Sequence, residues 1–155
     1  MESGVRIRIA EPKDVEAIAE LNLAMAAETE DKHLCRSTLV RGVRAVFDHA
    51  DHGFYIVAES DGEVVGCLLI TFEWSDWRCG VFWWIQSLYV RPPFRRRGVL
   101  RQLHEFVKTE ASQRPEICGL RLYVEQSNHV AQHAYRQIGM TMTAYRMYEQ
   151  ELAGE

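Results

Sequence analysis

Long apolar runs, paired cysteine motifs and targeting signals are all missing from this 155-residue sequence. No apolar run reaches the ~18 residues that a membrane-spanning helix needs, so we expect no membrane partner. The first residues, MESGVRIRIAEPKD, lack the charged-then-apolar pattern of a signal peptide, and the last, EQELAGE, carry no lipidation motif. The four cysteines (Cys35, Cys67, Cys79, Cys118) form no CxxC pair, which favours free thiols. Together these absences predict a cytoplasmic protein.

Basic charge is also scarce, because 18 Lys and Arg residues face 22 Asp and Glu residues, giving a net charge of −4. A general nucleic-acid binder is usually basic, so we expect no nucleic-acid partner. The charge is nevertheless uneven: residues 1–31 hold eight acids against three bases, whereas residues 91–101 hold five arginines and no acid. Such a concentration of arginine in an acidic chain indicates a site for one anion.

Several motifs of common enzyme classes are absent. The sequence contains no dinucleotide-binding GxGxxG, no GxxxxGK[ST] phosphate loop and no GxSxG nucleophile elbow. His129 and His133 have the spacing of a zinc-binding helix, but Val130 stands where a zinc protease has glutamate, and no third ligand is apparent. We therefore expect no metal site and read these histidines as surface residues.

With 47% hydrophobic and 26% charged residues, the sequence is long and apolar enough to form one core, and we expect one domain over residues 1–155. Apolar periodicity and turn residues predict an alternation of short elements. The predicted order is β-α-α-β-β-β-α-β-α-β, which indicates an α/β or α+β fold around a mixed sheet. The expected strands are residues 6–10, 54–58, 64–72, 81–90, 120–124 and 141–149, and the expected helices are residues 12–27, 37–48, 98–112 and 129–138.

The most informative segment runs from Gln86 to Leu100, where a strand leads through an arginine-rich turn into a helix. The first backbone N–H groups of a helix have no partner within it, and with the helix dipole they form an anion site suited to a phosphate or pyrophosphate. Gly98 leaves no side chain between this backbone and a ligand. A solvated basic turn with an ordinary glycine is the alternative interpretation of the same residues.

Three segments resemble one known family, the GCN5-related N-acetyltransferases (GNAT). Arg95–Leu100 resembles the acetyl-coenzyme A signature (Q/R)-x-x-G-x-(G/A), although Leu100 stands where Gly or Ala is usual. Residues 128–140 resemble the later N-x-x-A-x-x-x-Y-x-x-x-G-(F/M) helix, and residues 8–18 resemble the opening of the family. The three motifs occur in the family order, and the resemblance covers about residues 6–149.

The resemblance implies a mostly antiparallel mixed sheet in which the strands over residues 81–90 and 120–124 splay apart around acetyl-CoA as cosubstrate. It also implies that Tyr135 protonates the leaving thiolate, since a phenol can deliver a proton; an ordinary core tyrosine is the alternative. The implied acetyl-CoA-binding residues are Leu88, Tyr89, Val90, Arg95, Arg96, Arg97, Gly98, Val99, Leu100, Asn128 and Ala131.

The acceptor side is less defined. Many family members have a carboxylate where this sequence has Gln86, which binds an amine or carbonyl but cannot act as a base. Glu28 and Glu73 are the candidates for that role, with surface charge as the alternative for both. Trp74 and Trp84 suit a cationic substrate through their ring faces, and equally suit a core or a homodimer interface. Strand alternation predicts that Trp84 shares a face with Gln86 and Leu88.

The sequence thus predicts an enzyme, an N-acetyltransferase that transfers acetyl from acetyl-CoA to a primary amine of a small molecule by direct attack in a ternary complex. The aromatic and acidic residues around positions 71–84 resemble the diamine and polyamine branch of the family, although Gln86 departs from it. The alternative from another class is an acyl-CoA-binding sensor or partner-binding module without turnover. A protein N-terminal acetyltransferase is a third reading, and it requires an open groove for a peptide.

Overall fold

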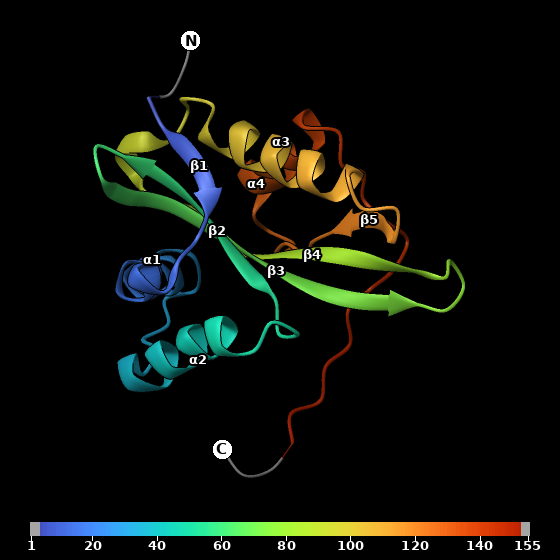
Figure 1. The fold of residues 1–155 in the computed structure, drawn as a ribbon, viewed down its shortest axis with the longest axis horizontal. Helices are drawn as coiled ribbons and strands as arrows, with labels where there is room; N and C mark the ends of the chain where they lie inside the picture. Colours follow the sequence, from blue (N-terminus) through green and yellow to red (C-terminus); the bar gives the residue numbers. More distant parts are fainter. Residues whose placement is uncertain (1–3, 153–155) are drawn as a thin grey trace. The chain divides into compact units, whose positions relative to one another are not determined.

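The computed structural model describes residues 4–152, and its five strands lie in the sheet in chain order, β1-β2-β3-β4-β5 (Figure 1). Strands β1 to β4 pair antiparallel, and β5 runs parallel to β4. The elements are β1 (Arg6–Ile9), a 3-10 turn η1 (Pro12–Asp14), α1 (Val15–Glu30), α2 (Arg36–Asp48), β2 (Phe54–Ser60), β3 (Glu63–Ser75), β4 (Gly80–Val90), a second turn η2 (Pro92–Phe94), α3 (Val99–Ser112), β5 (Ile117–Arg121) and α4 (His129–Gln137).

The chain divides into two compact units at Tyr123 and Val124. The first contains the whole sheet together with α1, α2 and α3, and the second contains α4 and the segment that follows it. Within residues 4–152, no helix combines the length and the apolar character that crossing a membrane requires.

Two apolar clusters cover the two faces of the sheet, as alternation along the strands requires. On one face, Val15 and Ile18 of α1 and Val43 of α2 pack with Tyr55 and Val57 of β2. On the other face, α3 packs its own apolar stripe against β2, β3 and β4. Figure 1 shows α1 and α2 together on one side of the sheet and α3 on the other.

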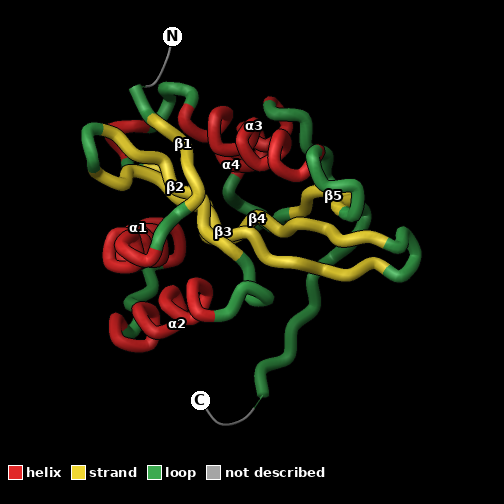
Figure 2. The backbone as a smooth tube through the Cα atoms, viewed as in Figure 1, coloured by secondary structure: helices red, strands yellow, loops and turns green. Residues whose placement is uncertain are grey.

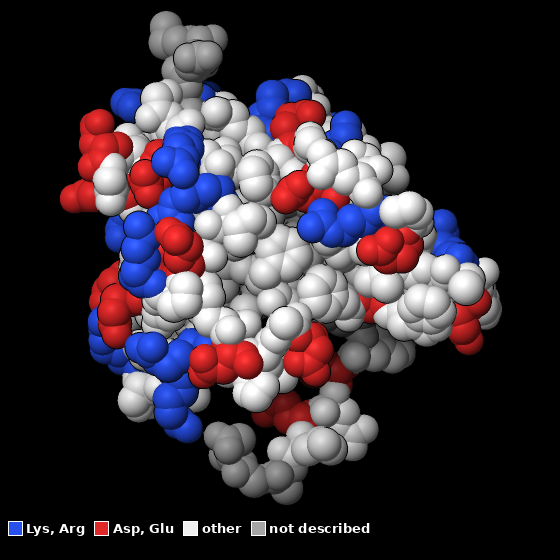
Figure 3. Space-filling view, in the orientation of Figure 1, with Lys and Arg blue, Asp and Glu red and all other residues white. Residues whose placement is uncertain are grey.

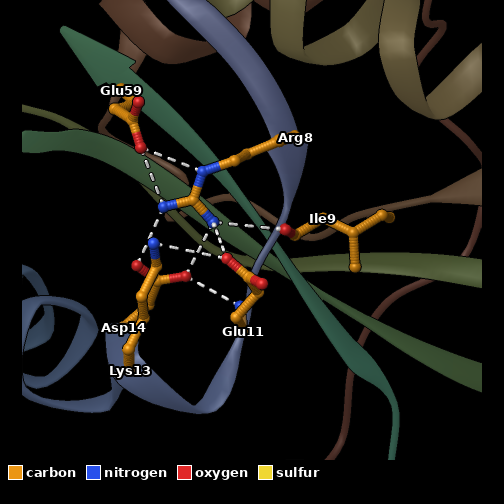
Figure 4. Close-up of polar contacts among 6 residues, drawn as sticks. All are labelled: Arg8, Ile9, Glu11, Lys13, Asp14 and Glu59. Carbon is orange, nitrogen blue, oxygen red and sulfur yellow. Dashed lines mark hydrogen bonds and ion pairs between the residues drawn. The ribbon is translucent and has the colours of Figure 1, made fainter. Parts of the chain in front are cut away.

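Polar contacts hold the start of α1 to β1 and β2. Arg8 of β1 donates to both carboxylate oxygens of Asp14 at 2.8 and 2.9 Å, and its Nε donates to Glu59 of β2 at 3.0 Å (Figure 4). The backbone N–H of Glu11 donates a third bond to Asp14 at 2.7 Å. These contacts explain the spacing of Arg8 and Asp14: the pair fixes the start of α1. Around α1 and α2, basic and acidic side chains are interleaved on the face in view (Figure 3).

A bulge in β4 corrects one expectation from strand alternation. Cys67 of β3 is opposite Tyr89, but Leu69 is opposite Gln86, so β4 holds one extra residue there. We assign Ser87 as the extra residue, because its φ of 52° lies in the left-handed region. The prediction that Leu88 shares a face with Trp84 and Gln86 is therefore wrong: Leu88 packs in the α3 cluster, and Tyr89 takes its place on the α1 face.

The strands after α3 also differ from the sequence expectation. The fifth strand spans Ile117–Arg121 rather than residues 120–124, because its pairing with β4 begins at Val81 and ends at Trp84. The expected strand over residues 141–149 is absent, and Figure 2 draws the segment as a loop. A strand needs a neighbouring strand as well as suitable residues, and residues 141–152 have none in the described chain.

Candidate functional site

The turn between β4 and α3 presents a run of unpaired backbone donors. The N–H groups of Phe94 and Arg95 donate to Arg91 and Pro92, but those from residues 96 to 100 have no acceptor in the described part of the chain. Gly98 caps α3 with φ of 82°, and a Cβ built on it would meet no atom within 4 Å. The left-handed backbone favours glycine at this position.

The arginines of this turn differ in how they are held. Arg95 Nη1 forms an ion pair with Glu28 Oε1 at 2.6 Å, while its Nε donates to the Val90 carbonyl at 2.8 Å. Its guanidinium also lies 5.2 Å from the centroid of the Tyr89 ring. Arg96 and Arg97 are exposed, and Leu100 is half-buried beside them in the first turn of α3. Arg95 is exposed too, but Glu28 pairs with its charge, so Arg96 and Arg97 supply positive charge at this turn without a carboxylate partner in the described residues.

Glu28, at the end of α1, connects that helix to the turn. Its second oxygen accepts a hydrogen bond from the Tyr89 hydroxyl at 2.7 Å. The hydrogen bonds from Arg95 and then Tyr89 hold the pKa of Glu28 below its usual value. Glu28 is therefore an anion at neutral pH and a weak base. Sequence reasoning missed this three-residue cluster, because residues 61 positions apart carry no local spacing signal.

The edge of β4 that faces β5 is only partly used. Pairing with β5 covers Val81 to Trp84, and from Ile85 to Val90 no strand lies on that edge in the described chain. The side chains of Leu88 and Val90 pack into the α3 cluster. The groups that this part of β4 presents along its β5-facing edge are therefore backbone N–H and C=O groups. The pairing of β4 with β5 ends at Trp84. The unpaired half of β4 leads into the arginine-rich turn and contains the Ser87 bulge.

A second polar cluster lies on the sheet where β3, β4 and β5 meet. Glu73 Oε1 accepts hydrogen bonds from Trp84 Nε1 at 2.9 Å and from Arg121 Nη1 at 2.8 Å. The Trp84 bond and, after it, the Arg121 bond outweigh partial burial and hold the pKa of Glu73 below its usual value. Nearby, the Gln86 side-chain amide donates to the Thr71 hydroxyl at 2.6 Å, which leaves the Gln86 carbonyl oxygen available as an acceptor.

The tryptophans do not gather in one place. The Trp84 ring lies 6.2 Å from that of Tyr123, on the face that carries Glu73 and Gln86. Trp74 is opposite Val81, and alternation along β3 puts it on the other face from Glu73. It is 61% exposed, and Trp77 in the following turn is 92% exposed. The structure thus brings Trp84, Glu73 and Gln86 together and separates Trp74 from them.

The second unit carries the remaining candidates. Asn128 caps α4, because its side-chain oxygen accepts from the Ala131 N–H at 3.1 Å. Ala131 and Tyr135 lie one turn apart on one face of this helix. Burial raises the pKa of Tyr135, so the phenol keeps its proton at neutral pH. His129 and His133 are exposed, and the described residues contain no cluster of three metal-ligating side chains.

Comparison with known proteins agrees with this geometry. The family model described as Acetyltransferase (GNAT) family matches residues 18–140. A solved structure from Clostridium difficile 630, described as a possible acetyltransferase, is 39% identical, with 97% of this chain and 99% of that chain covered and a TM-score of 0.90. A predicted acetyltransferase with acetyl-CoA from Clostridium acetobutylicum is 16% identical over 94% of this chain and 96% of that one, with a TM-score of 0.78.

Glucosamine-6-phosphate N-acetyltransferase from Arabidopsis thaliana also shares the fold, at 19% identity over 94% of this chain and 97% of that chain, with a TM-score of 0.71. The family match covers well over half of the sequence and contains the β4–α3 turn and the whole of α4. The family uses acetyl-CoA as its acyl donor. The chain therefore belongs to the GNAT acetyltransferase family.

Proposed function

We propose that this protein is an N-acetyltransferase that moves the acetyl group of acetyl-CoA onto a primary amine of a small molecule. The observation that carries the proposal is the run of N–H groups from residue 96 to residue 100, which has no acceptor in the described chain. Such a run at a helix N-terminus suits a pyrophosphate, and Arg96 and Arg97 add positive charge beside it. We also propose that residues 1–155 form a single acetyltransferase domain.

The rest of the donor site follows from the free edge of β4. Between Ile85 and Val90 the backbone has no β5 partner, so an extended ligand with amide groups is able to pair there, as a peptide does when it extends a sheet. Leu88, Tyr89 and Val90 supply this edge, and Val99 and Leu100 supply the last N–H groups of the turn. Ala131 leaves room on α4, and the Asn128 amide nitrogen remains available to a ligand beyond the cap.

The acceptor amine binds at the cluster on the α1 face of the sheet. Because Gln86 donates its amide hydrogen to Thr71, its carbonyl oxygen is oriented by that contact and accepts from the amine. Glu73 carries a negative charge that attracts an ammonium, and the Trp84 ring offers a face for a cation. Glu28 adds a further fixed negative charge at the end of α1.

In the reaction, the bound ammonium first loses a proton to water. The neutral amine nitrogen then forms a bond to the acetyl carbon while the bond from that carbon to sulfur breaks. Tyr135 gives its phenolic proton to the leaving thiolate, and the proton lost by the amine passes to water and restores the phenol. Neither Glu28 nor Glu73 serves as the base, because hydrogen bonds from arginine and aromatic side chains depress both pKa values. Holding both reactants together supplies much of the rate.

The test is release of free thiol from acetyl-CoA with a panel of mono-, di- and polyamines, using wild type and Tyr135→Phe. We expect the variant to lose about 10²-fold or more in kcat, the range for removing a general acid, with an unchanged Kd for acetyl-CoA. His133→Ala, an exposed change on the same helix, is the matched control and should retain activity. Equal turnover by Tyr135→Phe would remove the phenol from the mechanism.

One observation favours the second candidate, an acyl-CoA sensor without turnover. Leu100 is half-buried in the first turn of α3, where the family usually has a smaller residue, and the carboxylate of Glu73, near Gln86, is held by hydrogen bonds that lower its pKa. A sensor would bind acetyl-CoA tightly and release no thiol with any amine. Calorimetry and the thiol assay on the same sample therefore separate the two functions.

A further inference from the structure

An arginine on β5 faces the proposed acceptor site. Arg121 is opposite Trp84 of β4, and cross-strand neighbours share a face of the sheet, so its side chain lies on the face that carries Gln86. Its guanidinium carbon lies 3.6 Å from the centroid of the Phe82 ring, and its Nη1 donates to Glu73 Oε1 at 2.8 Å. Contacts with two other strands therefore fix this positive charge close to the residues to which we assign the amine.

The guanidinium of Arg121 keeps most of its donors for another partner. Its Nη1 binds Glu73, whereas its Nε and Nη2 have no acceptor within residues 4–152. Those two nitrogens form an edge through which arginine binds a carboxylate or phosphate with two parallel hydrogen bonds. The Arg121 side chain is 29% exposed, so this edge is open to a small ligand. Stacking on a ring and the bond to Glu73 orient the guanidinium before a ligand binds.

A second arginine adds positive charge at the same ring. Arg78, in the turn between β3 and β4, is exposed, and its guanidinium carbon lies 5.1 Å from the Phe82 centroid. Asp76 in that turn forms no ion pair with either arginine in the described part of the chain. Glu73 is thus the one described carboxylate that pairs with these two guanidinium groups. The site therefore presents positive as well as negative charge to an acceptor.

We propose that the acceptor carries an anionic group, a carboxylate or a phosphate, in addition to its primary amine, and that Arg121 binds this group. The inference rests on the proposed function, because it takes the amine to lie at Gln86. Trp84, beside Arg121, precedes Gln86 by two residues, which is roughly 7 Å along a strand. An acceptor whose amine and anion are several bonds apart spans that distance. A diamine would instead bring a second ammonium beside Arg121, and like charges repel.

The test compares thiol release with three amines that share a four-carbon chain: butylamine, γ-aminobutyrate and putrescine. In wild type, kcat/KM for γ-aminobutyrate should exceed that for butylamine about tenfold or more, the effect of one hydrogen bond between charged groups. Arg121→Gln should abolish this preference and improve putrescine relative to butylamine, because Glu73 loses its cationic partner. Arg121→Lys keeps the charge and should retain part of the preference.

Arg114→Gln is the matched control. Arg114 also stacks on an aromatic ring of β4, with its guanidinium carbon 5.4 Å from the Trp83 centroid, but Trp83 packs in the α3 cluster on the other face. This variant should keep the wild-type ranking of the three amines. The phosphonate analogue of γ-aminobutyrate separates the two anions: it should outperform the carboxylate where the natural group is a phosphate.

Two results would overturn the proposal and leave the proposed function intact. One is a wild type that uses butylamine or putrescine as well as both anionic amines. The other is an Arg121→Gln variant in which all amines slow by the same factor, as a purely structural ion pair predicts. Failure of every amine to release thiol would instead refute the proposed function. Calorimetry with γ-aminobutyrate and the protein–CoA complex then decides: we expect binding that Arg121→Gln weakens about tenfold, and absence of binding would refute the anion site.

Discussion

Changing Asp14 to asparagine should cost about 2–3 kcal/mol of unfolding free energy at neutral pH. The Asp14 carboxylate is 5% exposed and accepts two hydrogen bonds from Arg8 and one from the Glu11 backbone. Breaking a buried pair by removing one partner typically costs about 3–5 kcal/mol. The lower value applies here because Glu59 still binds Arg8 in the variant and the asparagine oxygen still accepts. For a chain of this length, the melting temperature should fall by about 5–10 °C.

The same variant should also change how stability depends on pH. Burial acts to raise the pKa of Asp14, but the hydrogen bonds from Arg8 and Glu11 outweigh it and lower that pKa. A carboxyl whose folded pKa is depressed stabilises the fold above its unfolded pKa of about 3.9, and this contribution is lost as the pH falls through the folded value. The difference between wild type and Asp14→Asn should therefore be full above about pH 5 and shrink in acid.

Urea unfolding of wild type and Asp14→Asn at a series of pH values measures both effects. Glu11→Gln is the matched control, because the Glu11 side chain is 60% exposed and lies 3.8 Å from Arg8; it should change stability by less than about 0.5 kcal/mol. A loss below about 1 kcal/mol for Asp14→Asn, or a loss that stays constant from pH 7 to pH 3, would refute the reasoning.

Three further outcomes follow from contacts of single residues. Gly119→Ala should cost about 1–3 kcal/mol in chemical unfolding, since its Cβ would lie 2.7 Å from the Phe82 ring; Gly42→Ala, within α2 and with no atom near its Cβ, should instead gain up to about 1 kcal/mol. Glu28→Gln should tighten acetyl-CoA binding about two- to threefold at low ionic strength and not in 0.5 M salt, as calorimetry would show. Trp84→Phe should raise KM for the amine and leave acetyl-CoA affinity unchanged in steady-state kinetics.

Local pattern was enough to predict the order of elements from β1 to α4 and the hairpin between β2 and β3. In that hairpin, Asp61 and Gly62 both have positive φ, as the Ser-Asp-Gly sequence suggests. Gly98 was likewise singled out from its place between strand and helix, as a residue that leaves no side chain beside a ligand; its left-handed backbone is a second reason for glycine that the structure adds. These features depend on residues that are neighbours in the sequence, so a single sequence is enough to predict them.

Features that depend on distant residues were not predictable. The residues next to Ser87 do not predict a bulge, because the bulge arises from the register between β3 and β4. The contact of Glu28 with Tyr89 and Arg95 joins three separate elements, and so carries no periodic signal. The prediction of a strand over residues 141–149 was wrong because it also depends on distant residues. The residue types suit a strand, but a strand needs a neighbouring strand, which local pattern does not reveal.

The extra residue in β4 reverses which positions of the strand face each side of the sheet. Before Ser87, Trp84 and Gln86 lie on the α1 side of the sheet. After Ser87, Tyr89 lies on that side and Leu88 lies on the α3 side. Deleting Ser87 would remove the bulge and leave a strand that alternates regularly, with Gln86 and Tyr89 still on the α1 side and Leu88 still packed under α3. At the bulge, therefore, β4 can lose a residue without moving its neighbours to the opposite face of the sheet, whereas a deletion within either regular half would move them.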